Sequence, residues 1–420
     1  MTHQTEIIAA VIFALAVLHT FSVKIFQEWA HRFPQGSVGE NLMHLLGEIE
    51  VVFGIWSMFL FLALIQTESL EKALEYIDTR NFTEPLFVFA VMVVASTKPI
   101  IDLASWSITN LARLLPLPRS ISFYITCLIA GPIMGSFITE PAAMTVTTII
   151  LIEKFYEKKI SDSLKYATLG LLFVNISIGG TLTHFAAPPV VMVAGIWNWD
   201  TPFMMAHFGW KAVIAIIFST IAVLVKYKGE LRKITLNPST KLQSPALMSF
   251  IHCLFLALIV ATAHHPKIFS SFLLFFLGFA TVTKEYQFSL KVREGLLVGF
   301  FLGGLVTLGG LQAWWINDVV RALNAGALFV ASIGLTGIFD NAALTYLGSL
   351  VPDITDASKY ALVSGAVVGG GLTVIANAPN PIGYGLLNSH FGRDGINPLQ
   401  LLKAAIFPTF VAALCFWFLP

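Results

Sequence analysis

Long apolar runs recur along most of this chain, and they constrain its fold more than any other feature. VVFGIWSMFLFLALI (51–65) and LLKAAIFPTFVAALCFWFL (401–419) are two of them. Each is near the roughly 20 residues that an α-helix needs to cross a bilayer. Only 12% of the 420 residues are charged, whereas soluble domains carry about 25%. Barrel strands would alternate polar and apolar residues, so the sequence predicts an all-α polytopic membrane protein.

The basic residues predict how the chain is threaded through the membrane. Most Lys and Arg fall in alternate connections, which the positive-inside rule assigns to the cytoplasm. This arrangement requires about eleven transmembrane helices plus two re-entrant hairpins, at about 120–153 from inside and about 325–352 from outside. The polar segment 227–243 is predicted to be a cytoplasmic linker between a first half, 1–226, and a second half, 244–420. We expect a multi-pass integral protein of the plasma membrane, here the bacterial inner membrane.

The two halves resemble each other at motifs that are unusual in apolar helices. FITEPAAMT (137–145) aligns with GIFDNAALT (337–345), so Glu140 falls opposite Asp340. GGTLTHFAAPPVVMVAG (179–195) aligns without a gap with GGGLTVIANAPNPIGYG (369–385). Because the two hairpins enter from opposite sides, the sequence predicts two inverted repeats. Each repeat has one hairpin and one broken helix, at about 163–197 and about 357–390, and paired interruptions of this kind indicate a binding site near the midplane.

Carboxylates in the middle of a membrane are functional by default. A carboxyl group in a low dielectric has a raised pKa, so it can exchange a proton for a cation near neutral pH. Glycine and proline interrupt the adjacent helices and free backbone oxygens, which suit small hard cations. We therefore expect Na+ at Glu140, Asp340 and Asn377. The wider cation- and proton-binding set is Thr139, Asn341, Thr181, Thr183, His184, Thr345, Thr373 and Asn380; for His184, packing is an equally weighted alternative.

Two further charged groups leave alternatives open. Lys98 and Asp102 are spaced i, i+4 within an apolar helix, so they form either a structural membrane charge pair or a counter-charge to an empty cation site. His44, Glu48 and Glu50 begin an apolar run. Solvation at the membrane interface is the favoured interpretation of these three residues, and a pH-sensing cluster is the alternative.

At the hairpin and broken-helix motifs, the sequence resembles the ion transporter superfamily, and most closely its putative sodium/proton antiporter family. The Asp340-Asn341 pair resembles the tip of the antiporter and arsenite branches. The resemblance covers about a third of the chain and implies an elevator-like scaffold-and-transport architecture and a homodimer. Glu140 departs from the asparagine expected at the first tip of related antiporters, which puts its role in doubt more than that of Asp340.

Together these features predict a secondary active transporter that exchanges Na+, with Li+ as a second candidate, for H+. The alternative is a sodium-coupled symporter of an organic anion of the dicarboxylate type, although two acidic tips would repel such a substrate. A channel or a membrane enzyme is less consistent with the motifs, since no hydrolytic or nucleotide-binding pattern stands out. We expect no enzyme activity and no cofactor beyond transported Na+ and H+. The expected partners are the lipid bilayer and small cations, with no nucleic acid at a net charge of +1.

Overall fold

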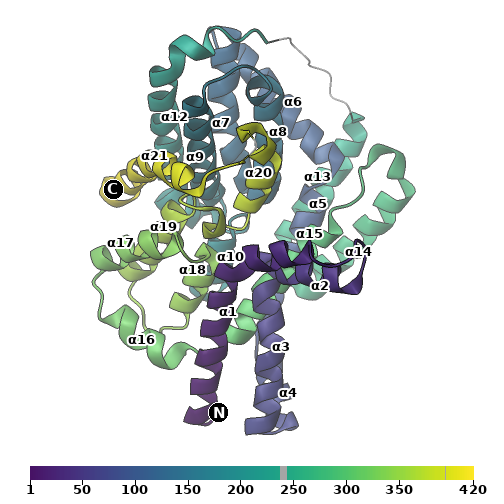
Figure 1. Ribbon diagram of the computed structural model, residues 1–420, viewed down its shortest axis with the longest axis vertical. Coiled ribbons are helices and arrows are strands. Elements are labelled where there is room, and N and C mark those ends of the chain that lie inside the picture. The colour runs from purple at the N-terminus through teal and green to yellow at the C-terminus, as the bar shows by residue number, and fades with distance from the viewer. Residues whose placement is uncertain (237–243, 393) are drawn as a thin grey trace.

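The computed structural model describes residues 1–236, 244–392 and 394–420, and within these ranges the chain forms helices and no strand. Figure 1 shows them packed into one bundle. The α-helices are α1 His3–Ala30, α2 Val38–Leu46, α3 Ile49–Thr67, α4 Leu70–Asp78, α5 Thr83–Ala95, α6 Lys98–Leu114, α7 Arg119–Ile138, α8 Glu140–Leu151, α9 Asp162–Gly179, α10 Pro188–Trp197, α11 Thr201–Met204, α12 Trp210–Leu231, α13 Ala246–Ala261, α14 Pro266–Val282, α15 Val292–Gly309, α16 Ala313–Arg321, α17 Ala325–Thr336, α18 Asn341–Ser349, α19 Asp356–Gly369, α20 Asn380–Leu387 and α21 Pro398–Phe418.

Several of these helices are long and apolar enough to cross a membrane. In the described part of the chain there are six such spans, namely α1, α3, α7, the continuous stretch Thr201–Leu231, α15 and α21. A seventh is possible if α5 and α6, which bend by 69° at their junction, form one span. These helices confirm the predicted all-helical, multi-pass architecture. The expected total of about eleven spans and the inverted orientation of the repeats stay predictions.

Small residues allow the long helices to approach closely. At Gly304 of α15, a Cβ atom would lie 2.4 Å from the backbone of Phe53 and Gly54 in α3. Only a glycine fits such a backbone crossing, and membrane helices rely on it because lipid supplies little hydrophobic drive for association. The start of α3 is thereby fixed against α15, a contact that matters for the position of Glu50.

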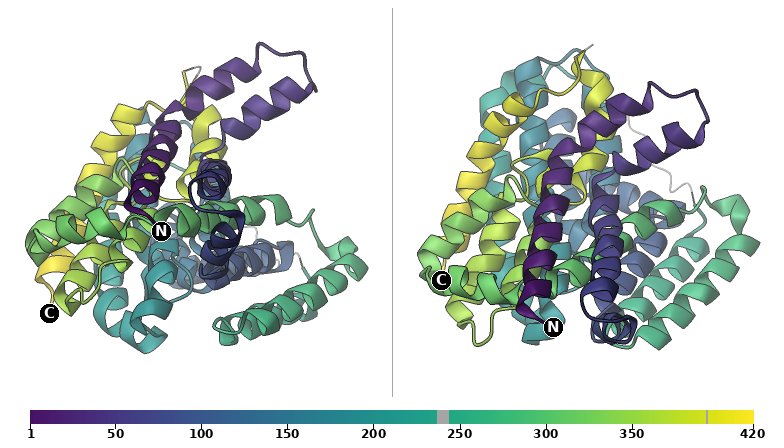
Figure 2. Two further views of the ribbon diagram at one scale, coloured as in Figure 1. Left: turned by 90° about the horizontal axis from the view of Figure 1, so that it is seen from below. Right: turned by 60° about the horizontal axis from the view of Figure 1, so that its bottom comes forward.

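The predicted linker at 227–243 begins within a helix, because α12 continues to Leu231. Its last part, 237–243, lies outside the described residues. After this linker, α13 and α14 pack against each other and against α5. Figure 2 shows them at the edge of the molecule opposite the C-terminus, so the second half of the chain begins far from where it ends.

Both segments with glycine- and proline-rich motifs are interrupted helices in the structure. Between α9 and α10 the chain forms a short 3-10 turn at Gly180–Leu182, then becomes extended at Thr183. Between α19 and α20 it is extended at Thr373 and Asn377. Each interruption exposes backbone groups in the interior, where side chains from elsewhere in the fold must meet them.

Candidate cation site

The two interrupted helices cross each other at the point where both end. A Cβ atom at Gly371 would lie 2.4 Å from the backbone of Val174 in α9. Ser177 Oγ of α9 donates a 2.7 Å hydrogen bond to the carbonyl of Val367 in α19. The last turns of α9 and α19 therefore share one buried crossing, and both broken segments open from it.

The first hairpin, formed by α7 and α8, turns at Thr139. This residue has φ 70° and ψ 153°, a backbone conformation that costs a non-glycine residue of the order of 1–3 kcal/mol. Gly135 in α7 faces Ala143 in α8, where a Cβ atom would lie 3.3 Å from the alanine methyl group. The close approach of the two helices places the strained turn at the tip, directly before Glu140.

Ser136 attaches this hairpin to the first interrupted helix. Its hydroxyl donates to the carbonyl of Gly179 at 2.7 Å and accepts from the amide of Leu182 at 2.9 Å. Its own carbonyl accepts a 2.6 Å hydrogen bond from Thr183 Oγ1. Thr183 was predicted as a cation ligand. In the structure its hydroxyl group donates its proton to the first hairpin, and this hydrogen bond attaches the hairpin to the interrupted helix.

Glu140 lies buried between the two interrupted helices, with none of its surface exposed. Its Oε2 accepts a 2.8 Å hydrogen bond from Asn377 Nδ2, and its Oε1 has no hydrogen-bond partner among the described residues. A Cβ atom at Gly180 would lie 2.5 Å from Oε1. The glycine of the first break thus makes room for the carboxylate, and the asparagine of the second break binds it.

The second tip places Asp340 at the start of α18. Its Oδ1 accepts hydrogen bonds from the amides of Ala342 at 2.8 Å and Ala343 at 3.1 Å. A carboxylate at this N-cap position also interacts favourably with the positive end of the helix dipole. Asn341 follows it, fully buried, beside Gly370 of the second break.

A small cavity of about 20 Å³ joins this tip to the second interrupted helix. Glu50, Asp340 and Asn377 all line it. This volume is enough for about one water-sized particle. Asn377 therefore binds the carboxylate of the first tip and lines the same cavity as the carboxylate of the second.

Glu50 lines this cavity, although the sequence interpretation favoured interfacial solvation for it and left it out of the candidate cation site. Its neighbour Glu48 does form an ion pair, with Arg293. Glu50 is two residues further along α3, and residues at this spacing point to different sides of a helix. The sequence shows that Glu50 is a carboxylate within the first turn of an apolar helix. The side of the helix to which it points, however, depends on how α3 packs against its neighbours.

Several buried oxygens of the predicted set have no partner within the described ranges, although buried polar groups are normally hydrogen-bonded. These oxygens are Thr139 Oγ1, Glu140 Oε1, Asn341 Oδ1, Asn377 Oδ1 and Asn380 Oδ1. Carboxylate, amide and hydroxyl oxygens are the ligands that hard cations prefer. No group of three or more His, Cys, Asp or Glu suited to a metal ion occurs in the described segments. The five oxygens instead combine one carboxylate oxygen with neutral amide and hydroxyl oxygens.

The other predicted threonines donate hydrogen bonds to backbone carbonyls. Thr181 Oγ1 binds the carbonyl of Ile178 at 2.7 Å, and Thr345 Oγ1 binds that of Ala342 at 3.1 Å. Thr373 Oγ1 binds the carbonyl of Gly337 at 2.8 Å, attaching the second hairpin to the second break. Their protons are therefore used structurally, and only lone pairs of their oxygens are left for a cation.

Asn380 and His184 differ in where the structure places them. Asn380 Nδ2 donates to the carbonyls of Gly370 and Thr373, at 2.7 and 2.8 Å, and so spans the second break. His184 instead forms a 2.9 Å hydrogen bond with Thr201 and stacks on His264. It shares a separate pocket with His264, so the structure does not bring it into the group around Glu140.

Lys98 and Asp102 form the predicted pair within α6. Lys98 Nζ lies 2.5 Å from Asp102 Oδ2, and Ser244 Oγ also donates to this oxygen. The pair thus connects α6 to the segment just before α13. This arrangement favours the structural interpretation of the pair over a counter-charge in the cation site.

Comparison with known proteins agrees with this geometry. Residues 4–419, nearly the whole chain, match the model of a family described as "Putative Na+/H+ antiporter". A search of curated proteins gives no match. The family match and the apolar helices identify an integral, multi-pass membrane transporter. The chain therefore belongs to the putative Na+/H+ antiporter family.

Proposed function

We propose that the protein exchanges Na+ for H+ at a site formed by Glu140, Asp340 and Asn377. The observation that carries this proposal is that Asn377 binds one tip carboxylate and shares a cavity with the other. A buried carboxylate is costly unless it is neutralised by a proton or paired with a cation. One site of this kind accepts either ion but not both, and such competition is the basis of exchange.

The neutral oxygens around the carboxylates favour sodium as the cargo. Asn341, Asn377 and Asn380 each contribute a buried amide oxygen without a partner among the residues described. These oxygens can replace the hydration shell of a cation without adding further negative charge, as unwound segments do in transporters. Li+ has the same charge and the same preference for oxygen, so it is the second candidate.

We assign Glu50 the role of the entry carboxylate. It lines the same cavity as Asp340 but belongs to α3, outside both hairpins and both interrupted helices. A negative charge at this position raises the local cation concentration next to Asp340. Its removal should weaken cation binding more than it slows the exchange itself.

The deciding experiment is exchange in everted vesicles acidified by respiration, with a fluorescent pH indicator. Addition of NaCl or LiCl should dequench the indicator with the wild-type protein. Asp340→Asn keeps an N-cap acceptor for α18 but removes the charge, so dequenching should be lost while the protein remains in the membrane. Asp356→Asn, at an exposed carboxylate in the first turn of α19, is the matched control and should exchange normally.

Sodium-dependent dequenching that survives Asp340→Asn would refute this site. No dequenching with any alkali cation between about pH 6 and 9, a range above the ordinary pKa of a carboxyl group, would refute the antiport itself. Sodium-dependent uptake of a labelled dicarboxylate would then be measured.

A further inference from the structure

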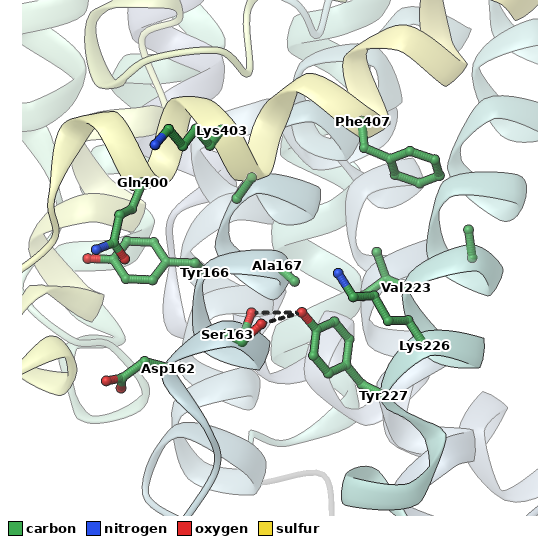
Figure 3. A pocket seen from close by; sticks show the side chains of 12 residues that line it. Asp162, Ser163, Tyr166, Ala167, Val223, Lys226, Tyr227, Gln400, Lys403 and Phe407 are labelled. Carbon is green, nitrogen blue, oxygen red and sulfur yellow. Dashed lines mark hydrogen bonds between the residues drawn. The ribbon is translucent and has the colours of Figure 1, made fainter.

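A pocket of about 830 Å³ lies between α9, α12 and α21, away from the residues assigned to cation exchange. Figure 3 shows its lining side chains. α9 contributes its first turns, α12 its last turns, and α21 its first three turns. Helix ends of this kind are where membrane-spanning segments reach the interface with water. A pocket at such helix ends would meet both lipid headgroups and hydrocarbon.

α9 and α21 pack closely beside this pocket. At Gly170 of α9, a Cβ atom would lie 2.6 Å from the backbone carbon of Ala404 in α21. The lining residues of α9 all precede Gly170 in the chain, and most of those of α21 lie near or before Ala404. The pocket therefore lies beside this crossing, towards the N-terminal ends of α9 and α21.

Two lysines give the pocket a positive charge that the protein does not neutralise. Lys226 of α12 and Lys403 of α21 both line it, and neither has a carboxylate partner within the described ranges. Asp162, the acidic residue of the lining, is paired with Lys165 at 3.0 Å. In Figure 3 the two lysines project from different helices on either side of the pocket.

The rest of the lining combines hydroxyl groups with an apolar surface. Tyr227 Oη lies 2.6 Å from Ser163 Oγ, and these groups are drawn near Lys226 in Figure 3. Val223 of α12 and Phe407 of α21 supply apolar surface. A charged rim beside an apolar wall matches an amphiphile better than a soluble anion.

We propose that this pocket binds one anionic phospholipid. Its phosphate would lie between Lys226 and Lys403, and an acyl chain would run along Val223 and Phe407. Basic pockets between transmembrane helices recognise anionic headgroups in this way. The proposal is independent of the ion that the protein exchanges, because none of these residues belongs to the cation site.

The test is lipid retention by the full-length protein, measured by native mass spectrometry after incubation with phosphatidylglycerol or phosphatidylcholine. The wild-type protein should retain phosphatidylglycerol preferentially. The double variant Lys226→Gln, Lys403→Gln should bind it roughly tenfold or more weakly, since each lysine near an anionic lipid contributes substantially to attraction. Glutamine removes the charge and keeps a polar side chain, although a shorter one, and gel filtration would confirm that the variant is folded.

The matched control is Lys228→Gln, Lys233→Gln, which removes one exposed lysine from the last turn of α12 and one just after the helix, both outside the pocket. It should leave phosphatidylglycerol binding unchanged. Equal losses in both double variants would overturn the proposal, since charge alone would then explain binding. Equal retention of phosphatidylcholine would also overturn it. If glycerol phosphate, which has no acyl chains, bound as tightly as the lipid, the pocket would be a soluble phosphoester site instead.

Discussion

Asn377 donates a 2.8 Å hydrogen bond to Glu140 across 237 residues of sequence. This bond connects the second interrupted helix to the tip of the first hairpin. The same asparagine lines the cavity of Asp340, so one side chain couples the two acidic tips. Because both partners are buried, their geometry is protected from competition with water.

Replacement of Asn377 by alanine should abolish most exchange. The substitution leaves both Glu140 oxygens without a partner, and such a buried group costs about 1–3 kcal/mol. We expect the rate of sodium-dependent dequenching to fall roughly tenfold or more. Asn324→Ala, at the exposed N-cap of α17, controls for loss of an asparagine elsewhere. Normal exchange by the Asn377 variant would remove this residue from the mechanism.

Glu140→Gln should eliminate exchange although it preserves the size of the side chain. Glutamine cannot alternate between a charged state that binds a cation and a neutral state that carries a proton. Vesicle assays over a range of NaCl concentrations would show whether any saturable exchange persists. If it does, with a rate like that of the wild type, Glu140 is a structural group and Asp340 alone carries the ions.

Gly180→Ala tests the contact between the first break and Glu140. The new methyl group would lie 2.5 Å from Glu140 Oε1 and 2.7 Å from its Cγ. Relief of this overlap should displace the carboxylate and cost about 1–3 kcal/mol of stability. Thermal unfolding in detergent and vesicle exchange should both decline.

Gly334→Ala is the control for that experiment. Gly334 lies in α17, and a Cβ atom there meets nothing within 4 Å. Alanine is favoured over glycine in a helix by about 1 kcal/mol, so this variant should be at least as stable as the wild type. A similar decline in both glycine variants would show that the contact with Glu140 is not the cause.

Glu50→Gln should raise the KM for sodium several-fold and leave the maximal exchange rate nearly unchanged. The physical reason is that a single charge near a partly buried site is worth roughly 1 kcal/mol or more. Titration of dequenching against NaCl concentration separates the two constants. Glu48→Gln removes the carboxylate that pairs with Arg293 and should leave the KM unchanged; a KM shift of equal size would contradict the entry role of Glu50.

The sequence by itself determined the class of protein and most of the candidate residues. Apolar runs of bilayer length need no tertiary information, because each helix satisfies its own backbone hydrogen bonds. Glu140 and Asp340 could also be identified from the sequence around them. A charge inside an apolar run is energetically costly, so it indicates a functional residue. The glycine and proline motifs indicated helix breaks because these residues act on their own backbone.

Only the tertiary structure decided which side chains meet. The bond between Asn377 and Glu140 depends on the crossing of α9 and α19, which no local pattern encodes. The same is true of Glu50, whose direction follows from the packing of α3 on α15, and of His184, which turns towards Thr201 instead of the carboxylates. Contacts between distant segments arise from the shape of the whole bundle, whereas sequence patterns report what each segment does alone.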